Sequence, residues 1–212
     1  MTGAELLAFT RELLRDQTAP YLWSDTAIYK YLNEGQRLLA ERTHCIIDDE
    51  SYTVATKADI RSYTLEDEIL LVMGARIDGE TEVLNPGFAA VGDSFFAGTT
   101  GQPTRYTLTG GSHRISFYPT PDAVYTVNLV VAIRPVSTIT ASVTPEIPAQ
   151  AHLALADYAA AKCLYHNDVD GLNITAADPF NASFIETVRD LKRQIYQHRL
   201  GPDANVVPMR IT

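Results

Sequence analysis

Helical patterns at both ends of the chain enclose a central stretch of strand patterns, and this order constrains the fold most. Apolar residues recur at helical spacing over residues 3–16 and from 24 or 25 to about 42, and again over 149–165 and from 178 or 179 to about 200. Short β-branched and aromatic runs separated by turn residues fill the region between them. Neither helix pair has enough apolar surface to be stable alone, so the sequence predicts that the two pairs form one four-helix bundle.

The predicted fold class is therefore α+β, with an antiparallel β module inserted between the two halves of a helical bundle. We assign residues 1–46 to the N-terminal helix pair and residues 47–136 to the β module. Residues 137–200 are a linker followed by the C-terminal helix pair, and residues 201–212 are an extended tail. A chain of 212 residues is long enough to bury roughly 70% of its unfolded surface.

Cap and turn residues predict where the elements begin and end. Ser24 or Asp25 caps the second helix, and Trp23 before it is expected to pack back on that helix. Asp78-Gly79 and the run 110–113 predict two hairpins. Pro86 predicts the start of a short helix through residues 88–96. The predicted strands are residues 51–56, 60–64, 69–77, 81–84, 105–109, 114–118 and 125–134.

Charge is spread unevenly along the chain, whose net charge is −9. Acidic runs fall in the first half, at residues 48–50, 66–68 and 78–82, and this acidity disfavours a protein that grips DNA phosphates over its whole surface. The balance reverses at the other end, where basic residues face only Asp190 and Asp203. A single charged run usually marks a solvated face, but the asymmetry indicates a basic end that docks on an acidic partner. The basic residues of that end are Arg189, Lys192, Arg193, Arg199 and Arg210.

No catalytic or metal-binding pattern competes with a binding role. The histidines at 44, 113, 152, 166 and 198 lack metal-ligand spacing and are predicted to be surface or helix-end residues. Cys45 and Cys163 form no motif, and Cys163 is expected to be a buried free thiol. The chain shows no signal peptide and no membrane span. We therefore expect a soluble protein that is no enzyme and needs no cofactor or metal.

Five short motifs follow one another along the chain. They are Trp23 with Tyr31-Leu-Asn-Glu-Gly-Gln36, then Pro103-Thr-Arg-Tyr106, Tyr118-Pro-Thr-Pro-Asp122, the helix start Glu146-Ile-Pro148, and Asn167-Asp-Val-Asp170 after an alanine-rich helix. None is diagnostic alone. In order and spacing together, they resemble the head-to-tail adaptor (connector) proteins of tailed bacteriophages.

The resemblance implies a structural protein of the virion. Such proteins form a ring of about twelve copies on the tail-facing side of the portal protein, extend the DNA channel and carry the tail nozzle or tail tube. DNA passes through without specific binding, assembly takes place in the host cytoplasm, and no membrane is involved. In relatives, C-terminal segments contact the portal. The matching portal-binding residues here are Arg189, Lys192, Arg193, Arg199, Val206, Val207, Met209, Arg210 and Ile211.

Three other interpretations remain open at this stage. A nucleic-acid-binding module would use the basic C-terminal helix and bind DNA in a salt-dependent way. Another virion component, such as a head-completion or tail-terminator protein, would differ in its partner more than in its fold. An enzyme would require a pocket with convergent polar groups, of which the sequence gives no sign.

Overall fold

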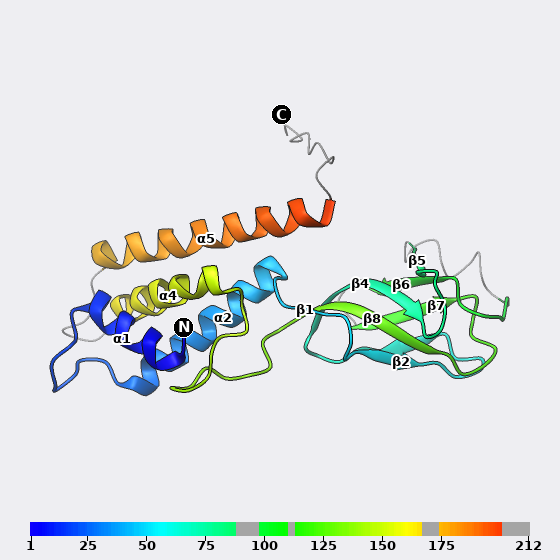
Figure 1. Ribbon diagram of the computed structural model, residues 1–212, viewed down its shortest axis with the longest axis horizontal. Helices are drawn as coiled ribbons and strands as arrows, with labels where there is room; N and C mark the ends of the chain where they lie inside the picture. Colours follow the sequence, from blue (N-terminus) through cyan, green and yellow to red (C-terminus); the bar gives the residue numbers. More distant parts are fainter. Residues whose placement is uncertain (88–97, 110–112, 167–173, 201–212) are drawn as a thin grey trace, which may run out of the picture. The chain divides into compact units, whose positions relative to one another are not determined.

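The structure is a computed structural model that describes residues 1–87, 98–109, 113–166 and 174–200, with side chains as far as residue 197 in the last helix. The chain divides into two units. The helical unit contains residues 1–45 and 135–212, and the β unit contains residues 46–134. The described residues form four α-helices and two β-sheets (Figure 1), so the predicted α+β class is confirmed.

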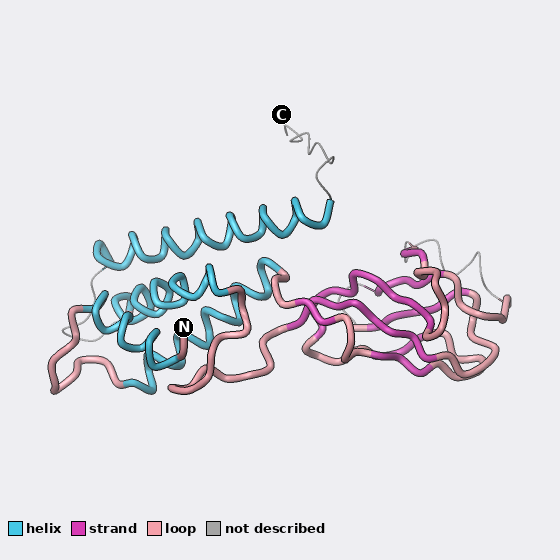
Figure 2. The backbone as a smooth tube through the Cα atoms, viewed as in Figure 1, coloured by secondary structure: helices cyan, strands magenta, loops and turns pink. Residues whose placement is uncertain are grey.

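Two helices come from each end of the chain, as the periodicity predicts (Figure 2). Thr2 caps α1 (Gly3–Leu14) and shares a capping box with Glu5. Ser24 caps α2 (Asp25–Thr43), because its side chain accepts a hydrogen bond from Ala27 N–H. The short 3₁₀ turn η1 (Ala149–Ala151) leads into α4 (His152–Tyr165), and α5 (Ile174–Leu200) follows.

The alanine-rich helix α4 contacts each of the other three helices, and α5 runs alongside it (Figure 1). Small side chains allow helices to approach closely on several sides, and five alanines of α4 are buried. The large buried side chains that fill the remaining space come from all four helices and from the segment before η1. They include Leu6, Ile28, Leu32, Leu39, Ile139, Leu155 and Phe184.

Two helix boundaries differ from the prediction. The first helix ends at Leu14 and not at residue 16, because Arg15 adopts the left-handed conformation (φ 55°) that ends it. The last helix begins at Ile174 and not at residues 178 or 179. Pro179 lies in its second turn, where it removes a single backbone hydrogen bond.

The β unit is built from two four-stranded sheets. In the first, β8 (Thr126–Ile133) pairs on one edge with β4 (Ile69–Ile77) and on the other with β1 (Ile47–Asp48) and β2 (Thr53–Ala55). The second has the order β3-β7-β6-β5, with β3 (Ser62–Thr64), β7 (Arg114–Tyr118), β6 (Arg105–Thr109) and β5 (Asn85–Pro86).

Both sheets contribute buried side chains to one core. Alternate residues of β8 point into it, since the side chains of a strand alternate between its two faces. Phe117 and Ile115 of β7 are fully buried in the same cluster. The core residues are Leu65, Ile69, Val72, Ala75, Ile77, Leu84, Tyr106, Ile115, Phe117, Val127, Leu129, Val131 and Ile133.

The strand predictions are partly right. The β6–β7 hairpin is confirmed, with Thr109 opposite Arg114. The predicted strand 81–84 is wrong, because only Val83 forms an isolated bridge, to Arg76. The module is not wholly antiparallel, since β5 pairs in parallel with β6. Pro86 lies in β5, and the predicted helix 88–96 and tail 201–212 lie outside the described residues.

Candidate functional site

The predicted basic surface lies on α5. One face of this helix packs against the rest of the helical unit. Phe184 is 1% exposed, and its ring lies 4.8 Å from that of Tyr158 on α4. Ser183 donates a hydrogen bond to the carboxylate of Asp157 (2.7 Å), and burial raises the pKa of that carboxyl. The buried residues at helical spacing along this face are Ala177, Phe184, Val188 and Leu191.

The opposite face of α5 carries exposed basic side chains near the end of the helix. Arg189, Lys192 and Arg193 are exposed and, with Tyr196, follow the i, i+3, i+4, i+7 spacing of one helix face. Arg193 pairs with Asp190 at 2.9 Å. Within the described part of the chain, no ion pair engages Arg189 or Lys192. We call Arg189, Lys192, Arg193 and Tyr196 the basic face of α5.

These side chains also line a hollow. Its volume is about 420 Å³, and Gln197 completes the described lining. Lysine and arginine bury their aliphatic stems while their charged heads stay in solvent, so this surface combines apolar contact with positive charge. Basic residues near a helix C-terminus also interact favourably with the helix dipole, by about 0.3–1 kcal/mol.

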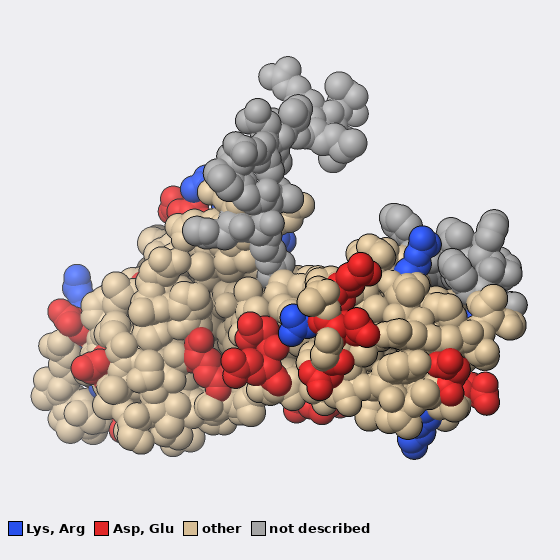
Figure 3. Space-filling model, turned by 45° about the vertical axis from the view of Figure 1, so that its right-hand side comes forward, with Lys and Arg blue, Asp and Glu red and all other residues tan. Residues whose placement is uncertain are grey.

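The other predicted portal-binding residues are not placed by the structure. Arg199 lies in α5, but its side chain is outside the described residues. Val206, Val207, Met209, Arg210 and Ile211 are also outside them. Acidic side chains predominate on the face drawn in Figure 3, and three acidic runs of the β unit contribute to the chain's negative charge.

The motif Tyr31–Gln36 holds the segment that leads into α4. Asn33 donates to the carbonyl of Ile139 (3.1 Å) and accepts from its N–H (2.7 Å), across 106 residues. Gln36, which is 2% exposed, accepts from the N–H of Glu146 at 3.1 Å. The Glu146 carboxylate in turn accepts the N–H groups of Val136 and Ser137. Two motifs that are far apart in sequence therefore form one hydrogen-bonded structure.

Two other residues of that motif, Glu34 and Gly35, contact α4. Glu34 accepts a hydrogen bond from Tyr158 (2.6 Å) and pairs with Lys162 (3.3 Å). The Tyr158 hydrogen bond lowers the pKa of Glu34, while burial and the same hydrogen bond raise the pKa of Tyr158. A Cβ on Gly35 would lie 2.9 Å from the Tyr158 ring, so a glycine permits this close packing.

A buried ion pair fixes the loop between α1 and α2. Arg11 and Asp16 pair at 2.9 Å, and their side chains are 8% and 9% exposed. Arg11 also donates to the carbonyl of Trp23 and to the carboxylate of Asp25. Trp23 is buried, and its ring forms a T-shaped contact with the ring of His166, with ring centroids 5.8 Å apart. Arg11 and Asp16 belong to no sequence motif, so neither residue was predicted.

Among the residues that the structure describes, the titratable groups do not converge on one site. No group of three potential metal ligands occurs among the described residues. Burial raises the pKa of the Cys163 thiol to about 12, as expected for a buried free cysteine and not for a nucleophile. His44 and His166 end helices, but the prediction of an ordinary helix-end residue is incomplete for His152, which is buried.

None of the described helices has a stretch that is both long and apolar enough to cross a bilayer.

Comparison with models of known protein families gives a match that covers nearly the whole chain. The family model described as SU10 adaptor protein matches residues 1–208, nearly the whole chain. This is a family of phage head-to-tail adaptors, which are structural proteins and not enzymes. No curated protein matches the chain.

Proposed function

The chain belongs to the SU10 adaptor protein family and is a structural adaptor of a phage virion, and we propose that it forms a ring between the portal and the tail. The ring contains about twelve copies, extends the DNA channel and carries the tail nozzle or tail tube. It assembles in the host cytoplasm and sits at the head–tail junction. In this proposal, the basic face of α5 and the segment that follows it bind the portal protein.

The exposed basic face of α5 is the observation that supports this assignment best. Its positive charge contrasts with the net charge of −9 of the whole chain. The buried face holds α5 on α4, so the basic side chains are offered to a partner from a rigid support. Charge complementarity favours an acidic surface as that partner. Arg199, Val206, Val207, Met209, Arg210 and Ile211 extend this contact.

Ring formation follows from many weak contacts. A subunit that gains a portal contact and two neighbours at once is held by several interactions, each of which is too weak alone. Subunits therefore stay separate until the portal gathers them. The acidic surface of the protein suits a channel wall, because repulsion from DNA phosphates prevents adhesion during packaging and ejection.

Co-sedimentation with purified portal rings, followed by imaging, tests the proposal. We expect saturable binding at about one copy per portal subunit and an added ring of density on the tail-facing side. Arg189→Glu/Lys192→Glu should weaken binding by at least about tenfold. The matched control is Lys57→Glu/Arg76→Glu, which makes the same change of charge at exposed residues of the β unit and should bind normally. Failure of the wild-type protein to bind would remove the proposed partner.

Truncation tests the assigned role of the tail separately. Deletion of residues 205–212 is expected to leave a folded protein that binds portal rings more weakly. Unchanged portal binding by the truncated protein would restrict the contact to α5.

The second candidate is nucleic-acid binding by the same basic face. Three cations on one helix face suit contacts with phosphates, and such binding falls steeply as salt rises. A fluorescently labelled duplex mixed with the purified protein distinguishes the two. Salt-sensitive DNA binding that Arg189→Glu/Lys192→Glu abolishes, without portal binding, would favour the DNA-binding function.

A further inference from the structure

The loop between α1 and α2 presents two large apolar side chains to solvent. Tyr21 is 50% exposed and Leu22 is 63% exposed. Isolated exposed apolar residues are common on protein surfaces and need no explanation. The backbone of the loop that carries Tyr21 and Leu22, however, is held in place by the buried ion pair between Arg11 and Asp16.

The carboxylate of Asp16 accepts both the N–H of Leu22 (2.9 Å) and the N–H of Trp23 (3.1 Å). Arg11 pairs with that carboxylate, and its guanidinium lies 3.8 Å from the centre of the Tyr21 ring. Trp23, directly after Leu22, is buried. The loop therefore holds Tyr21 and Leu22 in one arrangement, and we call this pair the Tyr21–Leu22 knob.

Fixing an exposed apolar pair in advance lowers the entropy lost when it binds a partner. Burying the charges of Arg11 and Asp16 has a large desolvation cost. Holding the Tyr21–Leu22 knob rigidly in place for a partner is a functional reason for this buried ion pair. Aromatic and large apolar anchors that fill pockets carry most of the energy of protein interfaces. The knob has the character of such an anchor.

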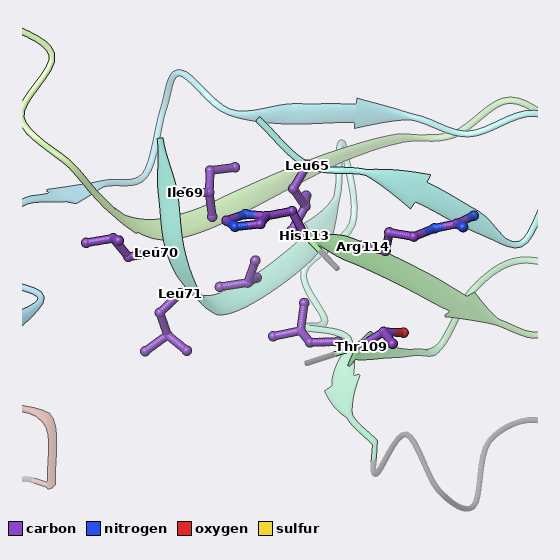
Figure 4. Close-up of a pocket in the computed structure, with 9 residues that line it drawn as sticks. Leu65, Ile69, Leu70, Leu71, Thr109, His113 and Arg114 are labelled. Carbon is purple, nitrogen blue, oxygen red and sulfur yellow. The ribbon is translucent and has the colours of Figure 1, made fainter. Parts of the chain in front are cut away.

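The β unit has a hollow of about 300 Å³ between the start of β4, the end of β6 and the start of β7 (Figure 4). The backbone closes one side of it, since Leu65 N–H donates to the carbonyl of His113 at 2.7 Å. Most of the lining is apolar, and His113, Arg114 and Thr109 add polar groups. The apolar lining residues are Leu65, Ile69, Leu70, Leu71, Val72 and Leu108.

An acidic turn, Glu66-Asp67-Glu68, connects two lining residues of this hollow, Leu65 and Ile69. Its backbone is fixed by Arg134, which donates to the carbonyls of Asp67 and Glu68 at 2.8 Å. The three side chains of the turn are exposed. The hollow therefore favours an apolar side chain that arrives beside a positive charge.

We propose that the Tyr21–Leu22 knob of one copy docks in this hollow on the β unit of a second copy. Exposed Arg15, in the same loop as the knob, is opposite in charge to the acidic turn. Because knob and hollow are different surfaces of one chain, the contact is heterologous and repeats around a ring. The proposal thus rests on the ring of the proposed function and names its lateral contact.

The size of the contact also favours a second copy of the chain as occupant. One knob buries far less than the roughly 1,200–2,000 Å² typical of a stable complex. A pair of copies is therefore held weakly, whereas a ring closed on a template gains from every repeated contact. This is the behaviour expected of subunits that assemble only on a portal.

Cysteine cross-linking tests the contact directly. Leu22→Cys protein is mixed with Leu70→Cys protein, assembled on portal rings, oxidised and run on a non-reducing gel. We expect disulfide-linked dimers from the mixture and none from either variant alone, which controls for Cys45 and Cys163. The double variant should give ladders of linked copies. Val124→Cys, at a residue 72% exposed in the β unit, replaces Leu22→Cys in the control mixture.

A second measurement needs no portal. Sedimentation velocity at rising concentration compares wild type with Leu22→Asp and with the control Val124→Asp. Weak self-association of wild type that Leu22→Asp reduces about tenfold, while Val124→Asp does not, supports the knob contact.

The two proposals fail in different ways. If the Leu22→Cys and Leu70→Cys mixture links no more than the control mixture while wild type still binds portal rings, the knob contact is wrong and the adaptor role stands. If wild type fails to bind portal rings, the proposed function fails. Cross-linking and sedimentation in concentrated solution then still decide whether knob and hollow meet.

Discussion

Gln36 accepts a hydrogen bond from the backbone N–H of Glu146, 110 residues further along the chain. The same glutamine donates to the carbonyl of Ser137 at 3.4 Å. Gln36 lies on α2, and Glu146 lies just before η1 and α4, so the bond ties the N-terminal helix pair to the segment that returns from the β unit. This contact joins the two parts of the helical unit that the β unit separates in the sequence.

Replacing Gln36 with alanine should therefore destabilise the protein. The substitution leaves the partly buried N–H of Glu146 without its partner, and an unsatisfied polar group away from solvent costs about 1–3 kcal/mol. Urea unfolding followed by circular dichroism measures the change. Gln150→Ala removes only the exposed bond to Gln194 and should change the unfolding free energy by less than about 0.5 kcal/mol. Equal effects of the two substitutions would contradict the assigned role of Gln36.

Gly3 is expected to tolerate no side chain. A Cβ there would lie 2.0 Å from the carbonyl oxygen of Thr140, whose neighbour Ala141 accepts a hydrogen bond from Ala4 N–H. Gly3→Ala forces α1 away from that segment, at a cost of about 1–3 kcal/mol. Gly74→Ala is the control, because its Cβ would meet Val130 at an ordinary 3.8 Å. Thermal unfolding compares them, and a fully stable Gly3→Ala protein would show that the segment is free to move.

Capping, turn and helix-start residues in the sequence predicted those helix and strand ends that depend only on residues nearby in the chain. The cap Ser24, the hairpin between β6 and β7 and the start of the alanine-rich helix were found in this way. The start of α5 was missed, because a proline usually opens a helix, whereas Pro179 lies inside one. The two-residue strand β5 was missed because its parallel pairing with β6 depends on the tertiary fold.

The site was predicted to the same limited extent. Residue charge was enough to locate the basic face of α5, since Arg189, Lys192 and Arg193 are close in sequence and share a helix face. Arg11 and Asp16 carried no such signal. Their pairing depends on the loop that returns from Asp16 to Trp23, and a lone arginine on a helix is usually solvated.

Breaking the Arg11–Asp16 pair should cost far more than breaking a surface pair. Arg11→Met leaves the buried carboxylate of Asp16 unpaired, and removal of one partner of a buried pair costs about 3–5 kcal/mol. Arg193→Met removes an exposed pair with Asp190 and should cost less than about 1 kcal/mol. Urea unfolding provides both values. Limited proteolysis should in addition cut residues 17–22 faster in Arg11→Met, and an unchanged cleavage rate would show that the pair does not hold the loop.

His152 should make stability fall as the pH is lowered. Its ring is 3% exposed; one nitrogen lies 3.0 Å from the carbonyl of Ile147 and the other lies 3.1 Å from the amino group of Met1. Burial, with a smaller effect of that amino group, lowers the pKa of His152 in the folded protein. The unfolded chain then binds the proton more readily, so the stabilisation is complete above the unfolded pKa of about 6.5. It is lost as the pH falls from there through the folded pKa.

The measurement is the unfolding free energy of wild type and His152→Gln in urea. The range from about pH 8 to about pH 5 brackets the ordinary histidine pKa of about 6.5. The glutamine amide can still donate to the carbonyl of Ile147 but takes up no proton, so the variant should lose less stability over this range, whatever its stability at pH 8. His113→Gln, at an exposed residue, is the control and should keep the wild-type dependence. If His152→Gln shows the same fall as wild type, protonation of other groups causes the acid sensitivity and the His152 contact with Met1 has no part in it.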